Sequence, residues 1–154
     1  MLRILKISSV ILVVIIFSIS ISYFIHDEES NSNDFYYEKK EILIGNKKII
    51  VDIADDDLKR EKGLSGRERL NDLEGMLFIF DKEGRYGFWM KDMNFSIDII
   101  WINEKNEIVY IEKDLNPESY PNVYYPDSDS SLVLEVVSGF SEENNLKVGD
   151  ILGI

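Results

Sequence analysis

The sequence predicts a mainly β (α+β) fold: a compact, barrel-like antiparallel β domain with two short helices, preceded by one N-terminal transmembrane or signal helix. Three observations predict it. Short apolar, β-branched segments alternate with turn residues over residues 41–154. Only residues 56–62 and 141–146 combine helix capping with helical length. Residues 7–25 form an almost unbroken apolar run, close to the ~20 residues that a membrane-spanning helix needs.

Composition narrows the possible functions. The chain has no cysteine, so disulfides, zinc–thiolate sites and thiol catalysis are excluded. The formal net charge is −12, and an acidic surface repels nucleic acid, so we expect no nucleic-acid partner. The single histidine, His26, lies next to the apolar run, so a histidine-based site inside the β domain is excluded. The sequence predicts neither a cofactor nor a metal site.

The N-terminal region predicts a location at the cell membrane. Arg3 and Lys6 precede the apolar run and Asp27 follows it, which orients the N-terminus to the cytoplasm and the β domain outward. Whether the run stays as a single-pass anchor or is cleaved as a signal peptide is open, because serines at 18, 20 and 22 have the spacing of a cleavage site. The domain would be secreted if it were cleaved. Residues 26–40, acidic and rich in serine and asparagine, are predicted to be a flexible tether.

The first part of the β domain, residues 41–154, predicts a hairpin and a helix. Residues 41–54 form two apolar strands around a Gly45-Asn46 turn. Asp55 is the predicted N-cap of a helix over residues 56–62, which Gly63 would end. The three consecutive aspartates at 55–57 also suggest calcium, but the alternating ligands of a calcium loop are absent, so helix capping is favoured.

The segment from Gly75 to Ile102 is the centre of the domain. Its pattern predicts strands over residues 76–80, 85–91 and 98–102, with a turn at 81–84 and a connection at 92–97. A further strand is predicted over residues 107–112. The loop 113–130 contains all three prolines and is predicted either to form the rim of a pocket or to lie across an open barrel end. A strand over 132–137, a short helix over 141–146 and a final strand over 151–154 complete the fold.

Two carboxylates stand inside apolar strands. Asp98 begins the strand 98–102 and Glu135 lies within the strand 132–137. A buried charge costs several kcal/mol unless it is paired, so both need partners. For Asp98 the candidates are Lys91, Arg85, Arg67 and the indole N–H of Trp89. The guanidinium of Arg67 can hold Asp98, Glu135 or an anionic ligand.

Several short motifs resemble the DUF192 family, in that family's order and spacing from about Lys48 to Ile154. They are GL..R at 63–67, GMLF.F at 75–80, FWMK at 88–91, DI at 98–99, LE at 134–135 with Gly139, and VGD at 148–150. The resemblance implies a small, mainly β, often exported domain of a prokaryotic family with no established activity. The family usually has a proline before its LDI motif, where this chain has Phe95-Ser96-Ile97.

Three functional hypotheses follow. The first is a membrane-tethered extracytoplasmic binding or accessory module of the cell envelope, whose small-molecule or envelope-polymer ligand would contact Arg67, Trp89, Lys91, Asp98 and Glu135. The second is a hydrolase acting on an envelope polymer with Asp98 and Glu135 as its acid/base couple, which requires both side chains in one cleft. The third is a structural domain without a ligand. We favour binding, and the sequence leaves enzymatic activity and protein partners open.

Overall fold

A computed structural model describes residues 36–154, which form one unit. Residues 1–35 lie outside the described part, so the anchor at 7–25 and residues 26–35 of the tether remain predictions. No helix within residues 36–154 is both long and apolar enough to cross a membrane. The first strand begins at Glu38, so the last three residues assigned to the tether belong to the sheet.

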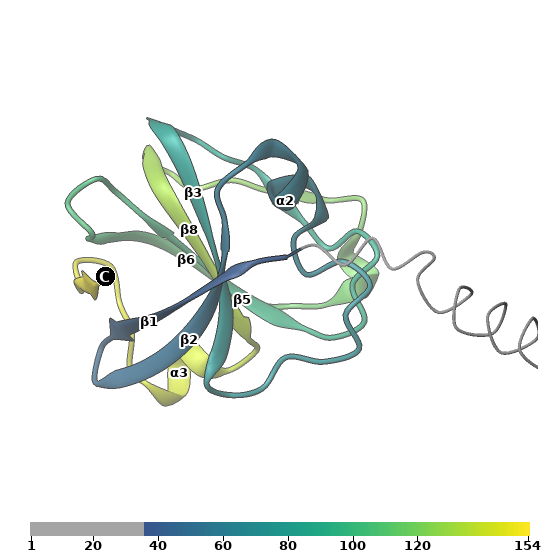
Figure 1. The fold of residues 1–154 in the computed structure, drawn as a ribbon, viewed down its shortest axis with the longest axis horizontal. Helices are drawn as coiled ribbons and strands as arrows, with labels where there is room; N and C mark the ends of the chain where they lie inside the picture. The colour runs from purple at the N-terminus through teal and green to yellow at the C-terminus, as the bar shows by residue number, and fades with distance from the viewer. Residues whose placement is uncertain (1–35) are drawn as a thin grey trace, which may run out of the picture. The chain divides into compact units, whose positions relative to one another are not determined.

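A seven-stranded sheet makes up most of the domain and curls into a half-barrel (Figure 1). Its strand order is β6-β5-β8-β3-β2-β1-β9, and an isolated bridge between Glu107 and Ile151 brings the C-terminal segment next to the start of β6. The strands are β1 (Glu38–Ile44), β2 (Lys47–Ala54), β3 (Glu74–Gly84), β5 (Ile97–Ile102), β6 (Ile108–Leu115), β8 (Ser130–Val137) and β9 (Leu152–Gly153). The predicted mainly β, curled fold with two short helices is confirmed.

The sheet departs from the predicted antiparallel arrangement at one place. β2 and β3 are parallel, with Asp52 opposite Met76 and Ile53 opposite Leu77, while every other neighbouring pair is antiparallel. Parallel neighbours need a crossover connection. Residues 55–73 form this crossover connection and contain the helix α2 (Asp57–Lys62).

The sheet buries both of its faces. One face carries a core that includes Ile100, Leu134 and Val136, and α3 (Phe140–Glu143) covers it through Phe140. The other face carries a second core that includes Phe78 and Trp101. Because side chains alternate between faces along a strand, a strand buried on both sides is apolar throughout. All six residues of β5 are accordingly buried.

The FWMK segment is more irregular than predicted. The expected strand over 85–91 shrinks to β4 (Phe88–Trp89), which leaves the main sheet and pairs with β7 (Val123–Tyr124). β7 belongs to the proline-containing loop, which also forms the 3₁₀ helix η1 (Pro117–Ser119). The loop therefore lies against β4, beside the pocket described below.

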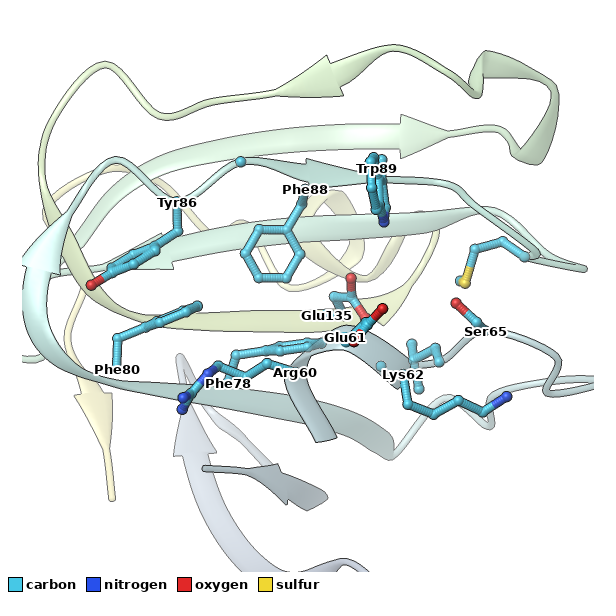
Figure 2. Close-up of a pocket in the computed structure, with 14 residues that line it drawn as sticks. Arg60, Glu61, Lys62, Ser65, Phe78, Phe80, Tyr86, Phe88, Trp89 and Glu135 are labelled. Atoms are coloured by element: carbon cyan, nitrogen blue, oxygen red, sulfur yellow. The ribbon is translucent and has the colours of Figure 1, made fainter. Parts of the chain in front are cut away.

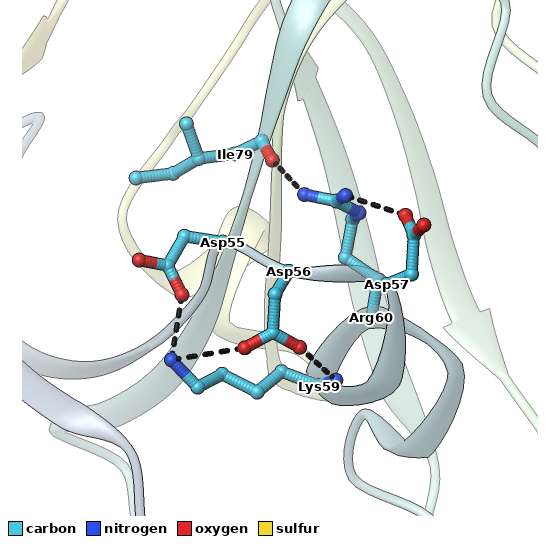
Figure 3. A network of polar contacts seen from close by, with 6 residues as sticks. All are labelled: Asp55, Asp56, Asp57, Lys59, Arg60 and Ile79. Carbon is cyan, nitrogen blue, oxygen red and sulfur yellow. Dashed lines mark hydrogen bonds and ion pairs between the residues drawn. The ribbon is translucent and has the colours of Figure 1, made fainter.

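Helix α2 starts one residue later than predicted. Asp56, and not Asp55, is the N-cap: its side chain accepts a hydrogen bond from the Lys59 backbone N–H at 2.8 Å (Figure 3). Asp55 pairs with the Lys59 ammonium group at 2.6 Å. Gly63 ends the helix with a positive φ of 49°. Nowhere in residues 36–154 do three or more acidic, histidine or cysteine side chains gather as a metal site.

Candidate functional site

Asp98 is fully buried at the start of β5, and its partners are backbone amides rather than basic side chains. Oδ1 accepts hydrogen bonds from the N–H groups of Asp114 (3.0 Å) and Gly139 (3.2 Å), and Oδ2 accepts one from Ser141 (2.8 Å). The prediction that Asp98 pairs with Lys91, Arg85, Arg67 or the Trp89 indole is therefore wrong. Hydrogen bonds from backbone N–H groups stabilise a carboxylate well. Asp98 thereby joins the end of β6 to the start of α3.

The structure does not bring Asp98 and Glu135 together. Glu135 on β8 is directly opposite Ile99, whereas Asp98 is opposite Val136. Residues directly opposite one another point to the same face of the sheet, and neighbours along a strand point to opposite faces. Asp98 thus lies on the face covered by α3 and Glu135 on the other. The two-carboxylate cleft expected for a hydrolase is not formed.

Glu135 is buried without a hydrogen-bond partner. Its side chain is on a residue only 4% exposed, and its Oε2 atom contacts no donor or acceptor among the described residues. Its neighbours on the adjacent strands, Met76 and Ile99, are apolar. Burial raises the pKa of Glu135 to about 8, a rise that the positive charge of Arg67 partly opposes. The carboxyl group is therefore protonated at neutral pH and can donate a hydrogen bond.

Arg67 holds a carboxylate that the sequence analysis did not single out. Its Nη2 donates to Oδ2 of Asp52 at 2.7 Å, and the Lys39 ammonium group binds the other oxygen of Asp52 at 2.8 Å. The prediction that Arg67 pairs with Asp98 or Glu135 is therefore wrong. Asp52 carries the same signal as those two, an acid inside an apolar strand, and could have been found by it.

A cavity of about 180 Å³ opens beside Glu135, between α2, β3 and β4 (Figure 2). In Figure 2, Phe88 and Trp89 lie above Glu135 in the view, and Phe78 and Arg60 lie below it. We call this cavity the aromatic pocket. It is lined by Arg60, Glu61, Lys62, Gly63, Leu64, Ser65, Phe78, Phe80, Tyr86, Gly87, Phe88, Trp89, Met93 and Glu135.

The rings of the pocket hold one another in place. Tyr86 stacks on Phe80 with ring centroids 3.5 Å apart, and the guanidinium of Arg60 lies 5.3 Å from the Phe80 centroid. Phe88 meets Phe78 edge to face at 4.8 Å. These contacts cover the ring of Phe80 and hold Phe78 and Phe88 in fixed positions beside Glu135.

Trp89 stands at the mouth of the pocket. It is 49% exposed, its ring meets Tyr120 of the proline-containing loop at 6.2 Å, and the Lys91 ammonium group lies 6.0 Å from its centroid. The loop thus contacts the pocket through Trp89, and none of the lining residues comes from the loop itself.

Two glycines permit this arrangement. A Cβ atom on Gly87 would lie 2.5 Å from a ring carbon of Tyr125, so a larger residue here would displace the Tyr125 side chain from the pocket wall. A Cβ atom on Gly75 would lie 2.8 Å from the carbonyl oxygen of Glu135. β3 can therefore approach β8 at Glu135 only with glycine at this position.

Of the five predicted binding residues, only two line the aromatic pocket. Trp89 and Glu135 do so; Lys91 stands beside Trp89, Arg67 binds Asp52, and Asp98 lies on the other face. Sequence reasoning missed the contribution of the end of α2 and the residues after it, from Arg60 to Ser65, and of Phe78, Phe80 and Tyr86. The aromatic residues were visible as a cluster, but nothing in the sequence indicated that α2 would face them.

Fold and site together define a small β domain that encloses an aromatic pocket around one buried carboxyl group. The chain belongs to the DUF192 family: the family model, described as "Uncharacterized ACR", matches residues 40–154. The resemblance found in the sequence motifs is thereby confirmed.

The solved structures similar to this chain include the following two. One is the crystal structure of a "putative transcription regulator" from Sinorhizobium meliloti 1021, with 26% identity, a TM-score of 0.73, and coverage of 78% of this chain and 96% of that one. The other is a protein of unknown function from Novosphingobium aromaticivorans DSM 12444, with 20% identity, a TM-score of 0.73, and coverage of 81% and 91%. No curated protein matches the chain.

Proposed function

We propose that this protein is a binding module of the cell envelope, held at the membrane by residues 7–25, which takes a ligand into the aromatic pocket. One observation carries the proposal: a buried carboxyl oxygen of Glu135 has no hydrogen-bond partner and belongs to a residue that lines the pocket. A buried polar atom left unsatisfied costs about 1–3 kcal/mol. A ligand that enters the pocket and forms a hydrogen bond with the carboxyl group of Glu135 would offset this cost.

Asp98 provides the contrast that supports this reading. It is equally buried, but its oxygens accept three hydrogen bonds, so its role in joining β6 to α3 accounts for it without a ligand. The side chain of Glu135 makes no hydrogen bond or ion pair with any residue of 36–154. A purely structural domain would gain stability from an apolar side chain at this position. The structural hypothesis thus explains Asp98 but leaves Glu135 unexplained.

The hydrolase alternative has lost its proposed second carboxylate. With Asp98 on the opposite face, the other carboxyl group of the pocket is Glu61 at the end of α2, which is exposed. Hydrolysis would therefore need Glu61 as the partner of Glu135. No contact between these two side chains favours that pairing, so we prefer binding.

The binding role is tested with the full-length chain, purified in a mild detergent, and a panel of soluble envelope fragments and small ring compounds. We expect binders, detected by ligand-observed NMR, whose affinity falls at least tenfold in Trp89→Ala, because half of the Trp89 ring is open to a ligand at the pocket mouth. Tyr36→Ala, which removes an aromatic ring that is 88% exposed, is the matched control. Binders that are unaffected by Trp89→Ala, or a panel without binders, would contradict the proposal.

The location is tested separately by adding a protease to intact cells. We expect residues 36–154 to be digested without lysis, because the positive charges of Arg3 and Lys6 hold the N-terminus in the cytoplasm. A cytoplasmic protein serves as the control for cell integrity. Digestion only after lysis would contradict the outward orientation.

A further inference from the structure

We propose that the aromatic pocket takes an uncharged six-membered ring whose oxygen atom accepts a hydrogen bond from the carboxyl group of Glu135, as a sugar ring or an aromatic alcohol would. This inference rests on the proposed function, because it names the class of ligand for the same pocket. It depends on the size of the cavity, on its walls, and on the charges around its base and its mouth.

The size of the cavity sets the size of the ligand group. At about 180 Å³ it is slightly larger than the roughly 150 Å³ apolar cavity that is known to accept benzene. One six-membered ring therefore fits, and a second ring would lie outside, against Trp89. Phe78 and Phe88, in edge-to-face contact at 4.8 Å, form one apolar wall against which a face of that ring can lie.

The base of the pocket supplies one hydrogen bond of defined direction. No basic side chain pairs with Glu135, because the guanidinium of Arg67 is bound to Asp52 at 2.7 Å. Met76 and Ile99 flank it on the neighbouring strands. A carboxyl group in such surroundings keeps its proton at neutral pH, as its raised pKa indicates, and acts as an O–H donor. The complementary ligand atom is an acceptor.

The charges around the pocket disfavour a cationic ligand. Three basic side chains lie at its edge and outnumber the acid Glu61: Arg60, which pairs with Asp57, and Lys62 line it, and Lys91 stands over the ring of Trp89. The aromatic walls alone would suit an ammonium group. An ammonium group would, however, need an ionised Glu135 and would meet these like charges. An uncharged ring meets neither obstacle.

Binding should then depend on pH through Glu135. Arg60, Glu61, Lys62 and Tyr86 are the charged or titratable groups that line the pocket with it; Lys91 stands over Trp89, and the ion pair of Arg67 with Asp52 lies nearby. A ligand that needs the protonated carboxyl group binds about tenfold more weakly at pH 9 than at pH 6.5 when the pKa is about 8. A ligand that needs the ionised group binds about thirtyfold more tightly at pH 9.

The experiment uses the full-length chain in detergent and three probes: methyl β-glucopyranoside, phenol and tetramethylammonium. Affinities are measured by NMR titration at pH 6.5 and pH 9. We expect at least one uncharged ring to bind, with about tenfold weaker affinity at pH 9, and no binding of tetramethylammonium. Whether the glucoside or phenol binds distinguishes a sugar from an aromatic alcohol. Partitioning of a probe into the micelle cancels, because wild type and variants share the detergent.

Two variants assign the effect to Glu135. Glu135→Gln keeps a hydrogen-bond donor at the base of the pocket but cannot ionise, so the uncharged ring should bind equally at both pH values. Glu142→Gln, an exposed glutamate on α3, should retain the tenfold dependence of the wild type. A pH dependence that persists in Glu135→Gln would overturn the inference.

The remaining outcomes separate the ligand class from the proposed function. Tetramethylammonium binding that strengthens at pH 9 would overturn the uncharged ring while leaving the pocket as a binding site. Failure of all three probes would overturn the ligand class, and the wider panel with Trp89→Ala then decides the proposed function independently.

Discussion

Replacing Asp98 with alanine should lower the free energy of unfolding by about 3–5 kcal/mol, because it removes the acceptors of three backbone N–H groups, one of them, that of Ser141, in a buried residue. Asp114, Gly139 and Ser141 donate these hydrogen bonds, and the buried N–H group of Ser141 would be left without an acceptor. The effect is measured by urea denaturation of a fragment of residues 36–154 at pH 7. Asp72→Ala, at an exposed position, is the matched control and should change stability by less than about 0.5 kcal/mol.

Asp98→Asn keeps the shape of the side chain but replaces one acceptor oxygen by an NH₂ donor, so it tests the hydrogen bonds separately from the packing. Its amide can accept from only one side, so its NH₂ group would face a backbone N–H that now meets another donor. We expect a loss smaller than that of alanine but still above 1 kcal/mol. If both variants unfolded at the urea concentration of the wild type, the structural role assigned to Asp98 would be wrong.

The pattern of strands could be predicted from the sequence because it depends on local alternation. Both faces of the sheet are buried, so β5 and β8 appear as apolar runs interrupted only where an acid is held, at Asp98 and Glu135. The sequence therefore identified the two acids as unusual. It could not assign them to faces, because a shift of one residue between β5 and β8 exchanges the faces.

The partners of these acids were beyond sequence reasoning for a physical reason. Every residue except proline has a backbone N–H group, so a carboxylate held by amides leaves no mark in the residue types around it. Basic side chains are visible in a sequence, and the prediction turned to Arg67 and Lys91 for that reason. In the structure Arg67 pairs with Asp52, and Asp98 accepts hydrogen bonds from backbone amides.

The aromatic pocket was predictable only in part. The FWMK motif located Trp89 at the site, but the opposite wall comes from α2 through the parallel pairing of β2 with β3. A crossover that carries a helix past the end of a sheet depends on long-range strand order. No local pattern between residues 55 and 73 specifies that order, so the contribution of Arg60 and Lys62 to the rim appeared only in the structure.

The second large effect is a loss of stability with rising pH, which Glu135→Gln should abolish. The pKa of Glu135 is about 8 in the folded chain and about 4.5 in the unfolded chain. Its protonated form is neutral, so the folded state suffers no penalty below pH 4.5. Between pH 4.5 and 8 the unfolded chain ionises while the folded chain does not, so stability falls by about 1.4 kcal/mol per pH unit.

The difference between wild type and Glu135→Gln should therefore grow with pH. The free energy of unfolding of Glu135→Gln minus that of the wild type should be about 3–4 kcal/mol larger at pH 7.5 than at pH 4.5. Urea denaturation of residues 36–154 measures both values. Glu142→Gln, on an exposed helix position, should show no such change. A difference that stays constant from pH 4.5 to 7.5 would mean that Glu135 is solvated or paired in the folded chain.

This cost bears directly on function. Glutamine has nearly the shape of glutamic acid and can donate the same hydrogen bond without ionising, so stability alone favours glutamine at position 135. A glutamate kept at the base of an aromatic pocket adds one property that glutamine lacks, a donor that is lost as pH rises through about 8. A ligand that accepts this hydrogen bond would stabilise the folded chain below that pH and be released above it.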